Sequence, residues 1–122
     1  MPCILLVDDD DLFRTMLAKK LARFGYETLE MRSGKDALAL YEQGHIDLLL
    51  TDLVMPEKEG LETIIELKSK YPQAVVIAMS GGGRGSATNY LELAKALGAN
   101  HLLTKPFSDE DLKITIQKAL GV

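Results

Sequence analysis

The sequence predicts an α/β protein of the (βα)5 type, in which a five-stranded parallel sheet carries helices on both faces. Strand-like and helix-like patterns alternate five times along the chain. The apolar runs at residues 4–7 (ILLV) and 48–51 (LLLT) are continuous, which is typical of strands buried on both faces of a parallel sheet. Right-handed crossovers between such strands place the helices over both faces. The pattern alone leaves the order of the strands open.

The first half of the chain contains three expected strands and two expected helices. The strands are expected at residues 3–8, 26–31 and 46–51. Apolar residues recur at helical spacing over residues 11–24, and Gly25 would end this first helix. Ser33 would cap the second helix, which Gly44 would end.

The second half contains the remaining strands, expected at residues 74–79 and 100–103. Helices are expected over residues 57–71, from Ser86 or Thr88 to Leu97, and over 108–120. Pro72 ends the first of these and Gly98 the second. Ser108 with Asp111 three residues later forms an acidic variant of a capping box for the last.

The composition indicates one cytoplasmic domain spanning residues 1–122. This length suits a single core, and 47% hydrophobic with 26% charged residues is an ordinary globular balance. The net charge of -4 and the absence of a basic run argue against direct binding of nucleic acid. Apolar runs stay far below the roughly 20 residues of a membrane span. The single cysteine, Cys3, has no partner for an internal disulfide.

Four consecutive acids follow the first apolar run. Asp10 or Asp11 fits helix capping and the helix dipole. Asp8 and Asp9 exceed what capping needs, and adjacent carboxylates are best tolerated beside a cation. Magnesium prefers a few carboxylate oxygens together with waters and phosphate oxygens, and Mn²⁺ has similar preferences. We therefore predict Asp8 and Asp9 as ligands of Mg²⁺, for which Mn²⁺ would be able to substitute.

Three further polar residues come at the ends of other expected strands. Asp52 follows the run at 48–51, Ser80 follows 74–79 and Lys105 follows the last strand. The carboxyl ends of parallel strands share one edge of the sheet, where ligands usually bind. A carboxylate can attack a phosphoryl group to form an acyl phosphate, which makes Asp52 a candidate nucleophile. Ser80 and Lys105 would donate hydrogen bonds to phosphoryl oxygens; the alternative role of Asp52 is that of a turn residue.

The chain resembles a response-regulator receiver domain, the phospho-acceptor module of two-component signalling. The resemblance spans the whole length and rests on the following fragments in order: ILLVDD at 4–9 with Arg14, Gly25-Tyr26, 47–56 with Gly60, Ser80, Gly98-Ala99, and Lys105-Pro106-Phe107.

This resemblance implies a flavodoxin-like fold with strand order 2-1-3-4-5. It implies that Asp52 accepts a phosphoryl group from a sensor histidine kinase or a phosphotransfer protein. The magnesium ion would be held by Asp8, Asp9, Asp52 and the backbone carbonyl of Val54. The protein would catalyse its own phosphorylation and dephosphorylation, without a separate substrate.

The resemblance also implies that Ser80 and Lys105 contact the phosphoryl oxygens, that the Lys105–Pro106 peptide is cis, and that phosphorylation shifts a two-state equilibrium. The switch position three residues before the lysine is usually aromatic in the family and is Leu102 here. The glycine-rich stretch at 81–85 predicts a flexible loop covering the phosphorylation site.

Other functions and several partners stay open at this point. Asp8-x-Asp10 also resembles the first motif of haloacid-dehalogenase-type phosphatases, with Asp8 as nucleophile and Asp10 as acid/base. A phosphorylation-independent interaction module on the same fold is a third alternative. The chain is either a single-domain regulator that acts on a downstream protein or a receiver whose output domain is missing. It would be a monomer or a phosphorylation-dependent dimer.

Overall fold

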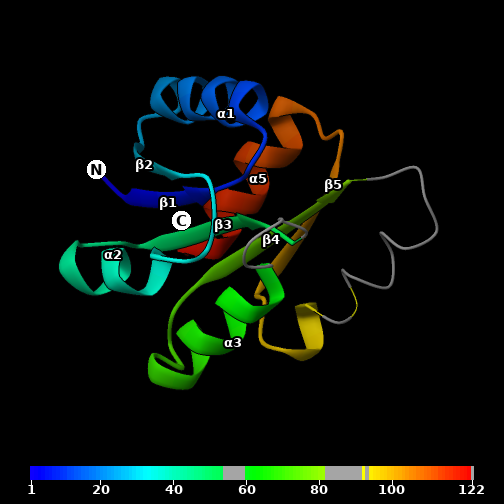
Figure 1. The fold of residues 1–122 in the computed structure, drawn as a ribbon. Coiled ribbons are helices and arrows are strands. Elements are labelled where there is room, and N and C mark those ends of the chain that lie inside the picture. The colour runs from blue at the N-terminus through cyan, green and yellow to red at the C-terminus, as the bar shows by residue number, and fades with distance from the viewer. Residues whose placement is uncertain (54–59, 82–91, 93, 122) are drawn as a thin grey trace.

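A computed structural model of the protein describes residues 1–53, 60–81, 92 and 94–121 (Figure 1). Its five strands form one sheet, and every neighbouring pair is parallel. The strands are β1 (Cys3–Val7), β2 (Glu27–Met31), β3 (Leu48–Asp52), β4 (Val76–Gly81) and β5 (His101–Lys105). Their order across the sheet is β2-β1-β3-β4-β5, which confirms the order implied by the resemblance.

Helices cover both faces of this sheet. They are α1 (Asp11–Arg23), α2 (Ala37–Gln43), α3 (Gly60–Lys70) and α5 (Asp109–Leu120). Figure 1 shows α1 and α5 on one face, and α2 and α3 on the other. Residues 92 and 94–96 are also helical, whereas the start expected at Ser86 or Thr88 lies outside the described residues. No helix in the described part of the chain combines the length and the apolar character needed to cross a membrane.

Alternate residues of the central strands supply two cores. Leu5 and Leu49 pack on the side of α2 and α3, whereas Leu6 and Leu50 pack on the side of α1 and α5. All five residues of β1 and of β3 are buried, which explains why both sequences are apolar without alternation. Each fully buried leucine contributes roughly 1.5–3 kcal/mol of transfer free energy.

The predicted caps of the first and last helices are confirmed. The Asp10 carboxylate accepts the backbone N–H of Phe13 at 3.0 Å, and the Ser108 hydroxyl accepts that of Asp111 at 3.0 Å. Gly25 follows α1 with φ of 96°, a left-handed conformation that glycine adopts without strain. Asp10 therefore has the capping role that was predicted for Asp10 or Asp11.

The predicted start of the second helix is wrong. Ser33 does not cap it: its hydroxyl accepts the N–H of Lys35 at 3.3 Å in a turn, and α2 begins only at Ala37. Gly34 packs so closely on α3 that a Cβ there would lie 1.8 Å from the Thr63 hydroxyl oxygen. This contact between distant segments fixes the turn, and the local capping signal does not reveal it.

Three strands extend further toward their carboxyl ends than the sequence pattern predicts. Asp52 is the last residue of β3, Ser80 lies within β4, and Lys105 is the last residue of β5. The sequence pattern places these polar residues beyond the end of each apolar run, yet the backbone ladders continue through them. These differences between the expected and observed strand ends are of the size usual for strand boundaries. As a result, the three polar side chains project from regular strand backbone.

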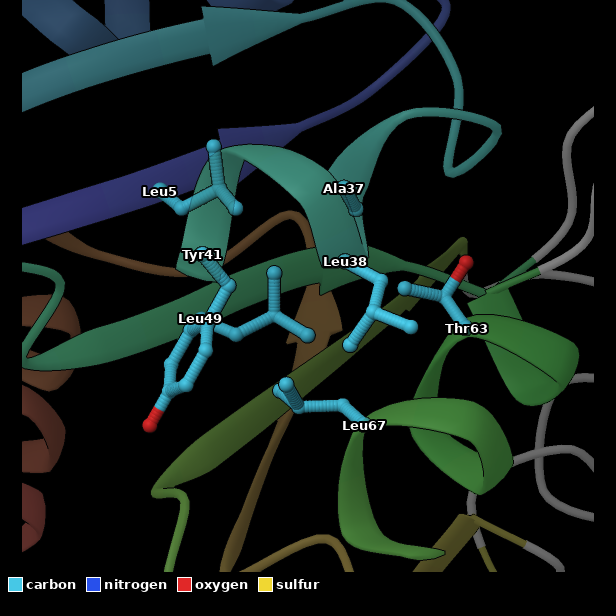
Figure 2. A pocket seen from close by; sticks show the side chains of 7 residues that line it. All are labelled: Leu5, Ala37, Leu38, Tyr41, Leu49, Thr63 and Leu67. Atoms are coloured by element: carbon cyan, nitrogen blue, oxygen red, sulfur yellow. The ribbon is translucent and has the colours of Figure 1, made fainter. Parts of the chain in front are cut away.

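A small, mainly apolar gap lies between α2, α3 and the sheet (Figure 2). It is lined by Leu5, Ala37, Leu38, Tyr41, Leu49, Thr63 and Leu67. The gap offers no space for a water molecule and lies against the middle of β1 and β3. It is a packing gap beneath a short helix, away from the strand ends that carry the polar residues.

Candidate functional site

The predicted site residues converge at the carboxyl edge of the sheet. Asp8 directly follows β1, and Asp52 and Lys105 are the last residues of β3 and β5. Oxygen atoms of Asp8, Asp9 and Asp52 all lie within 4.8 Å of one another. Two adjacent acids and a third that is distant in the sequence therefore form one cluster, which has the donor type and spacing to bind a divalent cation.

Asp8 is fully buried and is fixed by three contacts. One carboxylate oxygen lies 2.7 Å from Lys105 Nζ, and the other accepts the N–H of Asp10 at 2.9 Å. Its backbone carbonyl accepts a hydrogen bond from Arg14 Nη1 at 2.8 Å. Asp8 thus links the start of α1 to the end of β5.

Asp52 is 8% exposed and belongs to the same cluster. Its Oδ1 is 3.5 Å from Lys105 Nζ. The pKa of Asp52 is raised to about 6, chiefly by burial. The Lys105 ammonium and the backbone N–H of Leu53 lower this pKa, and the Asp8 charge raises it. The ordinary value is 3.8, so the folded protein disfavours the charged form of this side chain.

Lys105 supplies positive charge on the open side of the cluster. Its ammonium lies 2.7 Å from Asp8 and 3.5 Å from Asp52, and it also lies over the ring of Phe13, 4.2 Å from the centroid. The Lys105–Pro106 peptide bond is cis. One lysine facing three carboxylates leaves a deficit of positive charge, which a divalent cation would offset.

Ser80 is buried at the same end of the neighbouring strand, with 3% of its surface exposed. In the ladders, Asp52 pairs with Met79 and Ser80 pairs with Thr104. The structure therefore brings Asp8, Asp9, Asp52 and Lys105 into one cluster, with Ser80 at its edge. The predicted carbonyl ligand of Val54 and the glycine loop beyond Gly81 lie outside the described residues.

Sequence reasoning did not assign a site role to Phe13. Phe13 is one of the apolar residues that recur at helical spacing over residues 11–24, a pattern that predicts only a core position. Periodicity places it correctly on a partly buried face of α1, but it gives no information about a lysine at the end of β5. No signal in the sequence could have identified this contact.

Comparison with known proteins agrees with this geometry. The family model described as "Response regulator receiver domain" matches residues 4–117. The transcriptional regulatory protein CpxR of Klebsiella pneumoniae is 38% identical over 117 residues, an alignment that covers 96% of this chain and 48% of CpxR. The chain thus spans about half the length of that relative.

Two solved structures are similar over nearly the whole chain. A response regulator receiver domain protein from Clostridium thermocellum has a TM-score of 0.90 and 30% identity, covering 99% of this chain and 95% of that one. The response regulator TrrA of Thermotoga maritima, in complex with Mg²⁺ and BeF, has a TM-score of 0.87 and 30% identity, covering 98% and 100%. By the family match, the fold and the arrangement of its strand-end residues, this chain belongs to the receiver domains of two-component response regulators.

Proposed function

We propose that Asp52 is the residue of this receiver domain that accepts the phosphoryl group. The observation that carries the proposal is the buried Asp52 carboxylate at the end of β3, grouped with two further acids and the Lys105 ammonium. Burial disfavours the ionised form of this carboxylate, so a nearby positive charge stabilises that form strongly. Of the three acids, Asp52 is the one that lies within a strand.

The chemical step is an in-line displacement at phosphorus. An Asp52 carboxylate oxygen forms a bond to phosphorus while the bond between phosphorus and the histidine nitrogen of the donor breaks, and that nitrogen keeps the electron pair. Lys105 would donate a hydrogen bond to one phosphoryl oxygen, and Ser80 would donate its hydroxyl hydrogen to another. Asp8 would hold Lys105 at the site, as it does through the 2.7 Å contact.

The acidic cluster fits a magnesium ion. Asp8, Asp9 and Asp52 would hold it, with the Val54 carbonyl as a further ligand. When bound, the ion would neutralise charge on the phosphoryl oxygens and on the three carboxylates. The oxygen donor set and its spacing support this assignment, and Mn²⁺ has the ligand preferences to substitute.

The proposed partners follow from the family. We propose a sensor histidine kinase or phosphotransfer protein as the donor, and a downstream protein or an attached output domain as the recipient of the signal. The monomer would suffice for phosphoryl acceptance, and dimerisation would follow phosphorylation. A cytoplasmic location fits the free, buried Cys3, since reducing compartments keep thiols unpaired.

Intact-mass measurement after incubation with phosphoramidate or acetyl phosphate and Mg²⁺ tests the proposal. We expect the wild-type protein to gain the mass of one phosphoryl group, and the D52N variant to gain none. D36N is the matched control because Asp36 is exposed and its side chain makes no cap hydrogen bond. Phosphorylation of D52N at the wild-type rate, or loss of phosphorylation in D36N, would contradict the assignment.

The same experiment separates the phosphatase alternative. In that alternative Asp8 is the nucleophile and Asp10 the acid/base, so D8N would lose turnover of the donor and D52N would keep it. The structure disfavours these roles because the Asp10 carboxylate caps α1 through Phe13 and Asp8 is already bonded to Lys105. A protein that takes up no phosphoryl group would instead act as an interaction module.

A further inference from the structure

We propose that Phe13 is a positioning residue for Lys105, and that its aromatic face holds the lysine ammonium over the acceptor carboxylates. This inference rests on the proposed function of Asp52. It concerns the geometry of the lysine that would contact the incoming phosphoryl group, and it adds a residue of α1 to the site.

The geometry around Lys105 Nζ carries the proposal. Asp8 Oδ2 lies 2.7 Å and Asp52 Oδ1 lies 3.5 Å from the nitrogen. The Phe13 ring lies at 4.2 Å, measured to its centroid. The side chain of Lys105 is 19% exposed, so carboxylates and an aromatic face together replace most of the water around it.

An aromatic ring is suited to this position for an electrostatic reason. The face of a phenyl ring is negative and attracts an ammonium within about 6 Å, most strongly where water is excluded. A lysine side chain otherwise has four flexible bonds and about 2 kcal/mol of rotamer entropy. The ring therefore restrains the ammonium without adding a fourth carboxylate, which would raise the negative charge that a phosphoryl group must approach.

Phe13 is itself held in place from two directions. Its backbone N–H donates to the Asp10 carboxylate at 3.0 Å, which anchors the first turn of α1. Its ring meets Phe107 edge-on, with centroids 6.1 Å apart and planes at 84°. Phe107 lies two residues after Lys105, so one short segment supplies both the lysine and the ring that packs against Phe13.

Two measurements on the whole chain test the proposal, with F13L removing the aromatic face and F13Y retaining it. The first is the NMR shift of the Lys105 Hε protons, which the ring current should move upfield in the wild type and in F13Y but not in F13L. The second is the rate of phosphorylation by phosphoramidate with Mg²⁺, which should fall about three- to tenfold in F13L and recover in F13Y.

Phe24 provides a matched control. Its ring packs, like that of Phe13, against the core cluster on the side of α1 and α5. It lies 5.7 Å from Lys113 Nζ, so F24L removes a phenyl ring and a longer cation–aromatic contact outside the acceptor cluster. F24L should leave the Lys105 shift and the phosphorylation rate unchanged. Equal effects of F24L and F13L on the rate would overturn the proposal, because general destabilisation would then explain both.

A double-mutant cycle separates action through Lys105 from packing. In a K105M background, F13L should cause no further loss of rate; the same loss as in the wild type would overturn the proposal. An unchanged Lys105 shift in F13L would also overturn it. If the wild-type protein takes up no phosphoryl group, the proposed function fails, and the shift alone then decides whether Phe13 positions Lys105.

Discussion

Replacing Asp52 by asparagine should stabilise the fold at neutral pH. The pKa of Asp52 is about 6 in the folded protein, against an ordinary value of 3.8, chiefly because the carboxyl group is buried. Below pH 3.8 the group is protonated in both states and costs nothing. Between pH 3.8 and about pH 6, Asp52 is protonated in the folded state and ionised in the unfolded state, so the free energy of unfolding falls as the pH rises. Above about pH 6 the full destabilisation by the buried carboxylate is present.

The magnitude follows from the size of the shift. Roughly two pKa units correspond to about 3 kcal/mol as an upper limit. Water reaches part of the Asp52 side chain, and screening reduces the cost, so we expect D52N to gain about 1–2 kcal/mol at about pH 7.5. With a typical urea dependence, this gain moves the unfolding midpoint by roughly 0.5–1 M.

Urea unfolding at a series of pH values, with EDTA present to remove divalent ions, measures this gain. The difference between D52N and wild type should be largest at neutral pH and should vanish below about pH 4. D36N removes an exposed carboxylate and should show no such pH-dependent gain. A D52N protein no more stable than wild type at neutral pH, or a gain that is constant with pH, would refute the reasoning.

Two further predictions concern the metal and the backbone at the site. Magnesium at about a hundred times its dissociation constant should stabilise the wild-type protein by about 2.7 kcal/mol. Thermal unfolding with and without Mg²⁺ should show this gain in the wild type and its loss in D9N. A full gain in D9N would exclude Asp9 as a ligand. G60A should destabilise the fold by about 3 kcal/mol or more, since a Cβ there would lie 2.0 Å from the Asp52 carbonyl oxygen. G44A is its control because the nearest atom lies at 3.5 Å, and equal urea midpoints for the two variants would contradict the steric argument.

The fold could be predicted because its signals are local and repeated. Continuous apolar runs require burial on both faces, and five alternations of strand and helix leave a parallel sheet as the consistent arrangement. The strand order needed the family resemblance, since all the apolar runs look alike. The start of α2 could not be predicted, because the packing of Gly34 on Thr63 outweighs the local signal at Ser33.

The candidate site was predictable to the extent that strand ends determine it. Parallel strands bring their carboxyl ends to one edge, so the sequence alone groups Asp8, Asp52 and Lys105. The distances among them depend on side-chain conformations that spacing does not specify. The preference of Lys105 for Asp8 over Asp52, at 2.7 Å against 3.5 Å, is of this kind.

Leu102, the expected switch position, lies on the same face of the sheet as Ser80. It pairs with Ala78 in β4, and because side chains alternate along a strand, Ser80 points to the same face two residues further on. Leu102 packs there against the core cluster on the side of α2 and α3. Leucine has no hydroxyl group to hydrogen-bond, so a movement of Ser80 toward a phosphoryl group could be sensed at position 102 only through the space it leaves. We infer that phosphoryl acceptance depends on charges at the strand ends, whereas its transmission through Leu102 would depend on apolar packing alone.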